Sequence, residues 1–252
     1  MKLKSILTMA AMFFFVAANA QTADEIIAKY HENTGGVDKW KALQGMKMTA
    51  TLKAQAMEFP VEAVQLRGGK NFMSMKVQGM DFKQNVFDGN TLWSTNQMTQ
   101  KPEKAAAEET ENYKKNDAKD FPDSFLDYKN KGYKVELVGK ETVEGTETFK
   151  IKLTKNPIKI DGKETESISF YYFDTENFVP LLQETEMKGG PMKGMVMQIK
   201  TSDYQDVNGL MFPFSMTQGV KGQPGGANFV VSKIELDPKV DATAFAFPAE
   251  KK

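Results

Sequence analysis

The chain has 252 residues, with 33 basic and 33 acidic side chains, so its formal net charge is zero. A balanced charge gives no electrostatic reason to bind nucleic acid, and we expect no nucleic-acid partner. The length suffices for one large domain with a substantial core. Cysteine is absent, which excludes disulfides, thiolate metal sites and acylation on cysteine.

The first 20 residues have the pattern of a signal peptide. Lys2 and Lys4 precede an apolar run, and Ala18-Asn19-Ala20 supplies the small residues needed for cleavage between Ala20 and Gln21. We therefore expect export to the periplasm and a single mature domain at residues 21–252. No segment is long and apolar enough to span a bilayer comfortably, so we expect a soluble protein and not an integral membrane protein.

The mature chain should begin with a small helical cap. Thr22 suits an N-cap, and acidic residues follow it in the first turn of a helix predicted over Ala23–Asn33. A second short helical segment is predicted over residues 37–43. The only histidine, His31, is expected on the polar side of the first helix, near its C-terminal end.

From Met46 onward, apolar and polar residues alternate with the period of a β-strand. Turn signals such as Asp161-Gly162 and Asn208-Gly209 separate the successive runs. We count about ten strands, with helix confined to two places. This pattern predicts a mainly β (α+β) fold, in which a large antiparallel sheet curves strongly around what it buries.

The second helical place is predicted at Lys101–Lys131. Pro102 suits a helix start, and a second start is expected near Asp120-Phe121-Pro122. The segment is polar apart from a few apolar anchors, Phe121, Phe125, Leu126 and Tyr128. It is expected either to cover the mouth of the curved sheet as a lid or plug, or to be an ordinary crossover packed on the sheet.

The sequence shows no catalytic constellation. One histidine and no cysteine leave no Cys/His nucleophile pair and no common zinc ligand set, and no serine lies in a G-x-S-x-G context. The aspartates lie mostly in turns, and Asp88-Gly89-Asn90 is better explained as a hairpin turn than as a catalytic site. We therefore expect no enzymatic activity, no cofactor and no metal.

Methionine is frequent, and 13 of the 16 methionines follow residue 20. Most of them lie in predicted strands. Flexible, polarizable thioethers suit a surface that adapts to irregular apolar ligands, and they also suit a loosely shaped core. The sequence leaves both interpretations open.

Several stretches resemble one known family. "LRGGKNFMSMKVQ" and "VFDGNTLWSTN" resemble the segment of the LolA family of periplasmic lipoprotein carriers that contains an Arg-Pro-Asn turn, a strand and an Asp-Gly-Lys-Thr-Leu-Trp hairpin. "ADEIIAKYHENTGGVDKWKAL" and "YQDVNGLMFPFSM" are similar to the N-terminal helix and a later hairpin of LolA/LolB-like outer-membrane lipoprotein-sorting proteins. The resemblance covers about residues 23–247.

The resemblance implies an unclosed half-barrel whose concave apolar face receives acyl chains of lipoproteins or other lipids. It therefore implies a non-catalytic, monomeric periplasmic carrier or binding protein in outer-membrane lipoprotein sorting or lipid transport, with inner- or outer-membrane envelope proteins as further partners. An alternative is an envelope protein-interaction or stress-sensing module that uses the same fold without transporting lipid.

Candidate ligand-binding residues follow from strand alternation on that expected face. They are Met48, Leu52, Met73, Met75, Met195, Met197 and Phe214. An error of one residue in register would turn a whole strand to the other face. Trp93, one step inside its hairpin, is expected either to pack the lid or to touch the ligand.

Arg67 is the only arginine in the chain. By motif position it corresponds to the family arginine that hydrogen-bonds to the lid helices and helps to set how readily the cavity opens. Gly68-Gly69-Lys70 follows it here, in place of the family's proline. We therefore expect Arg67 to act in ligand binding as part of a latch. The altered turn, Gly68-Gly69-Lys70, is where this sequence departs from the family.

Overall fold

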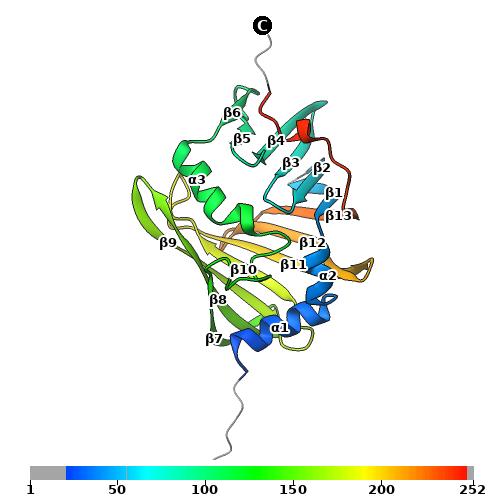
Figure 1. Cartoon of the computed structure of the whole chain (residues 1–252), viewed down its shortest axis with the longest axis vertical. Helices are drawn as coiled ribbons and strands as arrows, with labels where there is room; N and C mark the ends of the chain where they lie inside the picture. Colours follow the sequence, from blue (N-terminus) through cyan, green and yellow to red (C-terminus); the bar gives the residue numbers. More distant parts are fainter. Residues whose placement is uncertain (1–20, 55, 249–252) are drawn as a thin grey trace, which may run out of the picture.

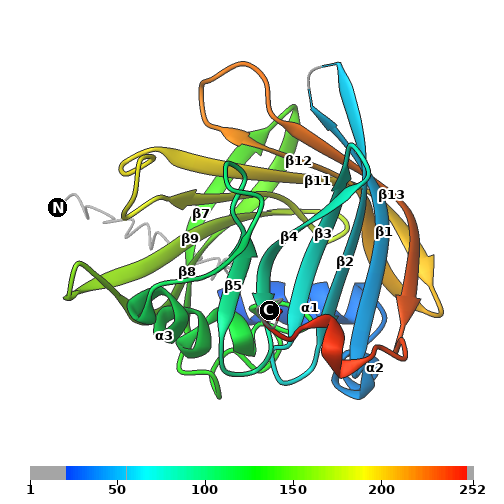
Figure 2. The same cartoon turned by 90° about the horizontal axis from the view of Figure 1, so that it is seen from above.

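The computed structural model describes residues 21–54 and 56–248, and the predicted signal peptide lies outside them. Thirteen strands form one antiparallel sheet, which curves strongly (Figures 1 and 2). The strands are β1 (Gly45–Ala54), β2 (Met57–Leu66), β3 (Asn71–Val77), β4 (Met80–Phe87), β5 (Leu92–Thr95), β6 (Pro102–Lys104), β7 (Lys134–Val143), β8 (Thr146–Ile160), β9 (Lys163–Asp174), β10 (Pro180–Glu186), β11 (Val196–Val207), β12 (Leu210–Val220) and β13 (Ala227–Leu236).

The strand order across the sheet is β6-β5-β4-β3-β2-β1-β13-β12-β11-β10-β9-β8-β7. Within the described residues the two edge strands, β6 and β7, do not pair with each other, so the sheet stays open along one side. The predicted fold class, a large curved antiparallel sheet that remains an unclosed half-barrel, is confirmed.

Tight hairpins explain why successive strands are neighbours. In the turns Gln78-Gly79, Glu144-Gly145, Asp161-Gly162 and Asn208-Gly209, both residues have positive φ angles. Two positive φ angles define the two-residue turn whose twist matches that of the flanking strands, and glycine takes the second position without strain. The predicted turns at Asp161 and Asn208 are therefore confirmed.

The connections at the two ends of the sheet differ in kind. One end carries the connections β1–β2, β3–β4, β5–β6, β8–β9, β10–β11 and β12–β13, and we call it the hairpin rim. The other end lies near α1 (Ala23–Asn33) and α2 (Val37–Ala42), and we call it the helix end. Figure 2 shows α1 and α2 low in the view and the β1–β2 and β12–β13 hairpins at the top.

Helix α1 has the predicted bounds and the predicted cap. The Thr22 hydroxyl accepts a hydrogen bond from the Glu25 amide at 3.2 Å, and the Thr22 amide donates to the Glu25 carboxylate at 2.8 Å. This reciprocal capping box satisfies two amides that a helix start leaves unpaired. Helix α2 follows at the second predicted segment, and its Trp40 is buried.

The segment between β6 and β7 differs from its prediction. The helix start expected at Pro102 is wrong, because Pro102–Lys104 pairs with β5 as the edge strand β6, where proline's missing amide hydrogen is tolerated. Helix α3 (Ala107–Lys115) begins five residues later and leads into a 3-10 turn, η1 (Asp117–Lys119). A second 3-10 turn, η2 (Ala242–Ala244), lies near the C-terminus.

The second helix expected beyond Asp120 is also absent from the described residues. Residues 120–133 form turns instead. The Asp123 carboxylate accepts hydrogen bonds from the amides of Phe125 and Leu126 at 2.6 and 2.8 Å. An aspartate side chain that bonds its own following amides stabilises a turn in competition with a helix. The four predicted apolar anchors of this segment are nevertheless all buried.

No helix within the described ranges is long and apolar enough to cross a membrane. The buried side chains form three clusters. The first joins α1 to β7, β8 and β9, and the second joins α2 to β1, β2, β12 and β13. The third lies on the other face of the sheet, where Phe245, from the segment after β13, covers Phe72, Val86 and Trp93.

Candidate functional site

Strand register identifies the concave face of the sheet. Ala50 pairs with Val61 on β2 and with Val231 on β13, and these three residues are buried in the cluster that contains Trp40 of α2. Residues two steps apart on a strand share a face, so the register assigns further apolar residues to this side. We call them the apolar strip: Met48, Leu52, Phe59, Met73, Met75, Met197, Phe214, Met216 and Phe229.

The concave face is filled unevenly. Near the helix end, Ala50, Val61 and Phe212 are buried by the residues that pack on them. Every residue of the apolar strip is only half-buried. Half-buried thioethers and aromatic rings on a concave face form a surface that an apolar ligand can cover further. The less covered part of the face therefore lies between the buried core and the hairpin rim, and Phe82, opposite Met75, is a buried exception within it at 8 % exposed.

Six of the predicted candidates lie together in the apolar strip: Met48, Leu52, Met73, Met75, Met197 and Phe214. Contact between these six residues and a ligand stays a prediction. Met195 lies apart from them, in the β10–β11 connection at the hairpin rim, where its side chain is 39 % exposed.

Trp93 lies on the opposite face of the sheet. It pairs with Val86 across β4 and β5, and its indole nitrogen donates a hydrogen bond of 3.0 Å to the Phe245 carbonyl. The Phe247 ring packs edge-on against it at 5.8 Å. The expectation that Trp93 packs the lid is wrong, because the segment after β13 covers this indole instead. Contact between Trp93 and a ligand stays a prediction.

Three members of the apolar strip were not among the candidates: Phe59, Met216 and Phe229. Phe59 and Phe229 flank Leu52 on its two neighbouring strands, and Phe229 also pairs with Met216. On β13 a β-bulge interrupts the alternation of apolar and polar residues that would identify Phe229. The bulge lies opposite Thr49/Ala50, where the register with β1 shifts by one residue. A bulge changes the spacing of inward residues, so simple alternation fails there.

Asp88 has the structural role expected of it. Its Oδ1 accepts hydrogen bonds from the amides of Asn90 and Thr91 at 2.8 and 2.7 Å, and Gly89 has a φ of 104°. The stretch Asp88-Gly89-Asn90 is thus the connection between β4 and β5, and local backbone amides satisfy the carboxylate.

Residues 105–133 cross from one edge of the open sheet to the other, and we call them the strap. At one end, the Glu108 carboxylate accepts from the amides of Asp161 and Gly162 in the β8–β9 hairpin at 3.0 and 2.8 Å. Further along α3, Tyr113 hydrogen-bonds to Asn71 on β3, and its ring packs against Phe87 at 4.9 Å. The strap therefore ties together the two halves of the sheet.

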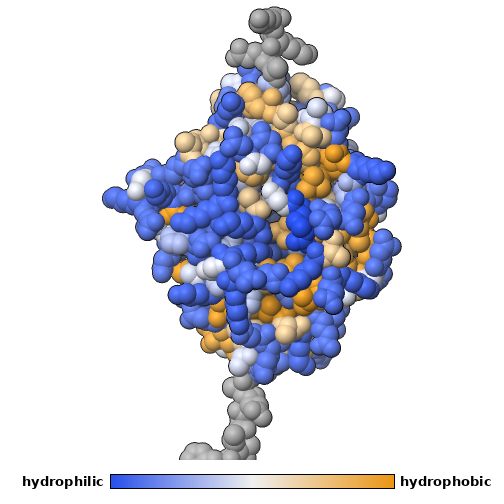
Figure 3. Space-filling model, viewed as in Figure 1, coloured by the Kyte–Doolittle hydropathy of each residue, from blue (hydrophilic) through white to orange (hydrophobic). Residues whose placement is uncertain are grey.

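The outer and inner parts of the strap differ in burial. Helix α3 has no buried residue, whereas Phe121, Phe125 and Leu126 of the inner part are buried in the concave face. The side of the molecule that carries α1 and α3 is mainly hydrophilic, interrupted by separate hydrophobic areas (Figure 3). The inner part of the strap thus behaves as a plug, and α3 as a polar cover.

Arg67 holds α2 and touches the strap. Its Nε and one terminal nitrogen donate hydrogen bonds of 2.9 and 3.0 Å to the carbonyls of Leu43 and Trp40, at the end of α2. A cation is favourable at this end of a helix. The guanidinium also lies 5.6 Å from the Phe121 ring centre. The latch was expected to hydrogen-bond to the lid, but the hydrogen bonds of Arg67 go to the end of α2 instead. A role of Arg67 in ligand binding stays a prediction.

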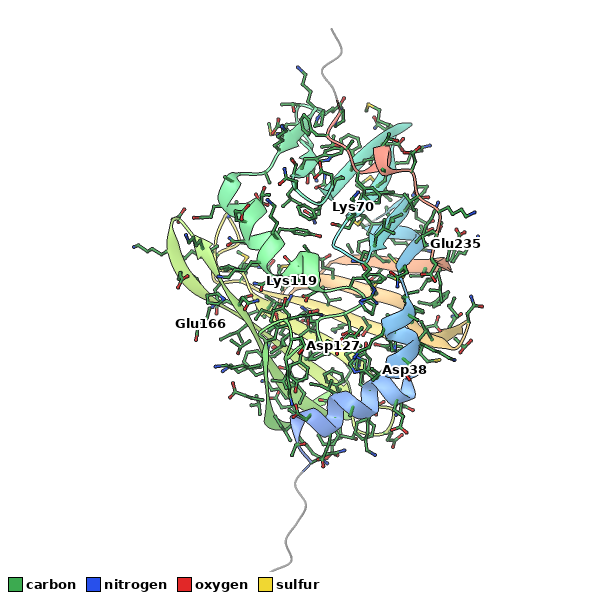
Figure 4. The ribbon with its side chains drawn as sticks, in the orientation of Figure 1. Asp38, Lys70, Lys119, Asp127, Glu166 and Glu235 are labelled. Carbon is green, nitrogen blue, oxygen red and sulfur yellow. The ribbon has the colours of Figure 1, made fainter. Side chains whose placement is uncertain are left out.

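The glycines after Arg67 allow the strap to come close. Gly69 has a φ of 92°, and a Cβ at this position would lie 2.6 Å from the carbonyl oxygen of Ala118 in η1. A side chain there would collide with the strap backbone. The departure from the family's turn sequence therefore has a physical reason. Figure 4 labels Lys70 and Lys119, the residues that follow Gly69 and Ala118 in the chain.

A polar group lies inside the plug, next to α1. The Nε2 atom of His31 lies 3.6 Å from Oδ2 of Asp123, and the Tyr30 hydroxyl donates to the same oxygen at 3.1 Å. The expectation that His31 lies on the polar side of α1 is wrong, because its side chain is only 5 % exposed. Burial raises the pKa of Asp123, but His31, the Leu126 amide and Lys131 outweigh it and hold that pKa below its ordinary value.

A second buried polar group joins the strap to β8. Lys155 hydrogen-bonds to Asp120, whose other oxygen accepts from the Tyr133 hydroxyl at 3.0 Å. Burial lowers the pKa of Lys155, but the charges of Asp120 and Asp117 outweigh it and raise that pKa above its usual range. These groups pair with one another, so they stabilise the strap and present no unpaired nucleophile or base for catalysis.

Comparison with known proteins agrees with this architecture. No protein-family model matches the chain, and no curated protein sequence matches it. Among solved structures, a LolA superfamily protein from Nitrosomonas europaea matches 90 % of this chain and 98 % of its own length, with a TM-score of 0.54 and 14 % identity. A putative outer membrane lipoprotein-sorting protein domain from Vibrio parahaemolyticus matches 88 % and 94 %, with a TM-score of 0.53 and 11 % identity.

The chain therefore has a LolA-like fold, as the sequence resemblance predicted. At this level of identity the likeness concerns the fold alone. What the concave face of this chain binds has to be argued from its own residues.

Proposed function

We propose that this protein is a non-catalytic carrier or binding protein for acyl chains, either of a lipoprotein or of another lipid. It acts in the periplasm after export, in lipoprotein sorting or lipid transport. The apolar strip carries this proposal. Nine apolar side chains of one concave face remain half-buried, although neighbouring positions on the same strands are fully packed.

The chemistry of the strip favours an acyl chain over a rigid ligand. Five of its members are methionines, whose unbranched thioethers adjust to a flexible chain at little cost. Burying each CH₂ group of a ligand contributes about 0.8 kcal/mol in gross transfer terms, so a long chain needs no specific polar contact to be held. Helix α3 has no buried residue and carries mostly polar side chains, so it suits a polar headgroup at the surface.

The strap gives such a ligand a cover that can move. Helix α3 is held mainly by polar contacts at its surface, from Glu108 to the β8–β9 hairpin and from Asn112 to Lys159 at 2.6 and 2.8 Å. Exposed contacts of this kind break at low cost, whereas the plug is anchored by buried aromatic side chains. We therefore expect entry of the ligand beneath α3, with the plug staying in place.

The test is to purify the protein from its own envelope, extract it, and identify bound lipid by native mass spectrometry. Displacement of a fluorescent fatty acid then measures the affinity. The variants Met75→Gln and Met216→Gln keep the side-chain length and add a polar group to the strip, and each should weaken binding by about tenfold, that is about 1.4 kcal/mol.

Val230→Gln is the matched control. Val230 follows Phe229 on β13, so it points to the opposite face, where it is 44 % exposed. Its substitution should leave binding unchanged. Purified protein without bound amphiphile, combined with no displacement of the fluorescent probe, would refute the carrier function and favour the alternative of a protein-interaction or stress-sensing module.

A further inference from the structure

Exposed methionines gather at one end of the molecule. Among the described residues, seven large hydrophobic side chains are exposed, and four of them are methionines: Met57 at 55 %, Met80 at 41 %, Met98 at 93 % and Met195 at 39 %. Each lies in or next to a different connection of the hairpin rim, in the order β1–β2, β3–β4, β5–β6 and β10–β11. Four separate hairpins thus present the same residue type to solvent at the same end.

The charges of the hairpin rim have one dominant sign. The six connections there contain four lysines, Lys101, Lys188, Lys193 and Lys221, and a single acid, Asp161. Lys188 and Lys221 form ion pairs with Glu186 and Glu184 of β10, at 2.9 and 2.8 Å. Lys101 and Lys193 have no ion pair within the described residues and are exposed.

The helix end provides an internal comparison. Its five strand connections contain two basic residues, Arg67 and Lys70, and three acidic ones, Asp88, Glu144 and Glu176. They contain no methionine. The combination of exposed methionine and surplus lysine is therefore a property of the hairpin rim and not of the hairpins in general.

From this distribution we propose that the hairpin rim docks on an anionic lipid surface. Lysines near a membrane are attracted to anionic headgroups, and apolar side chains on separate loop tips can enter the interface one by one. A rigid protein partner would favour a contiguous apolar patch, whereas these methionines stand on four different connections. A soft interface accommodates such spaced contacts.

The position of the rim agrees with docking of the open end of the concave face. Leu52 and Phe59 lie one step inside the β1–β2 connection that leads to Met57, and Met75 lies one step inside the β3–β4 connection that leads to Met80. The apolar strip therefore continues toward the rim. Docking through the rim does not itself require acyl binding, so each proposal can fail without the other.

The test is co-sedimentation of the purified protein with vesicles of phosphatidylcholine, with and without phosphatidylglycerol. We expect binding only to vesicles that contain phosphatidylglycerol, weakening as salt is added. The combined variant Met57→Ser, Met80→Ser, Met98→Ser, Met195→Ser should bind at least tenfold more weakly. So should the variant Lys101→Gln, Lys193→Gln.

The matched control is Val37→Ser combined with Val138→Ser. These valines are 40 % and 54 % exposed but lie on α2 and on β7, away from the hairpin rim. The control should bind vesicles as the unmodified chain does. All exposed positions tolerate polar side chains, and circular dichroism checks that each variant is folded.

Three outcomes would overturn the proposal: no binding of the unmodified protein to anionic vesicles, equal binding to both vesicle types, or equal loss of binding in the valine control. Displacement of a fluorescent fatty acid is measured on the same samples. A methionine variant that loses vesicle binding but keeps fatty-acid binding supports the docking surface and separates it from the acyl-chain site.

Discussion

The two ends of the concave face are built from the same strands but differ in how they are completed. At the helix end, α1 and the inner part of the strap fill the curve with aromatic and aliphatic side chains, and Phe173 and Ile151 are fully buried. Toward the hairpin rim, Phe214 and Met75 remain half-buried. One end thus supplies the stability of the fold, and the other leaves apolar surface available for a ligand.

Polar groups follow the same division. The pairs His31–Asp123 and Asp120–Lys155 lie in the filled end, where they fix the strap on α1 and β8. Buried carboxylates are tolerated where partners satisfy them, and here Asp123 accepts from the Tyr30 hydroxyl and Asp120 accepts from Lys155 and Tyr133. The open end carries methionines and phenylalanines without such groups. A ligand that entered it would meet little fixed charge.

The largest expected difference comes from removing one aromatic side chain at each end. Phe173→Ala should lower the free energy of unfolding by roughly 3–5 kcal/mol, because the fully buried ring leaves a cavity among Tyr30, Phe125 and Tyr171. Phe214→Ala should cost less than half as much, since its ring is already partly in water. Urea unfolding measures both.

The ligand assay should give the opposite ranking. Fatty-acid binding should weaken more in Phe214→Ala than in Phe173→Ala, as long as both variants are folded at the assay temperature. Equal losses of stability in the two variants would mean that the open end is packed as tightly as the filled end. That result would contradict the contrast between a filled helix end and an open end near the hairpin rim.

A smaller effect is expected where the strap touches the turn after β2. Gly69→Ala should destabilise the protein by about 2–3 kcal/mol, because the new Cβ collides with Ala118 and the backbone has a positive φ. Amide hydrogen exchange of residues 116–120 should become faster, since the strap must move away to relieve the collision.

Gly68→Ala is the matched control for this prediction. Gly68 has nearly the same φ, 90°, but nothing lies within 4 Å of its Cβ position. It should therefore cost only the conformational penalty of roughly 1–2 kcal/mol. If the two variants had equal stability and equal exchange rates, the close contact between Gly69 and Ala118 would make no measurable contribution to stability.

The strands, hairpins and first helix can be predicted from the sequence, whereas the conformation of the plug cannot. Capping residues, X-Gly turns and strict alternation are local signals, so α1, the hairpins and the concave position of Met48, Leu52 and Met75 follow directly from them. The plug does not, because the Asp123 side chain bonds the backbone in place of a helix, and its partner His31 is distant in sequence. Local pattern cannot show that pairing.

Two further features show the same limit of local sequence pattern. The alternation of β5 correctly shows that Trp93 is buried. It does not show that the segment around Phe245, distant in sequence, returns to cover the indole on the face opposite the concave one. On β9, Tyr171 and Phe173 face the core, whereas Phe170 and Tyr172 lie on the other face beneath Lys150. With apolar residues on both faces of a strand, alternation does not identify the core side.

The smallest of the three effects on the free energy of unfolding is expected from Asp123, which lies beside His31 at the filled end. This effect depends on pH. The pKa of Asp123 is below its ordinary value of 3.8 in the folded protein. The ionised carboxylate therefore stabilises the fold fully above pH 3.8, and this contribution is lost as the pH falls through the lower folded-state pKa. Asp123→Asn should cost about 1–2 kcal/mol at neutral pH.

The difference in unfolding free energy between the unmodified protein and Asp123→Asn should therefore shrink as the solution is acidified below pH 3.8. Asp127→Asn is the control, because Asp127 pairs only with the exposed Lys41 at 2.9 Å and should show a small effect at any pH. Urea unfolding across this range measures both variants. A difference that stayed constant into acid would show that Asp123 stabilises the turn as a hydrogen-bond acceptor alone, without a contribution from its charge beside His31.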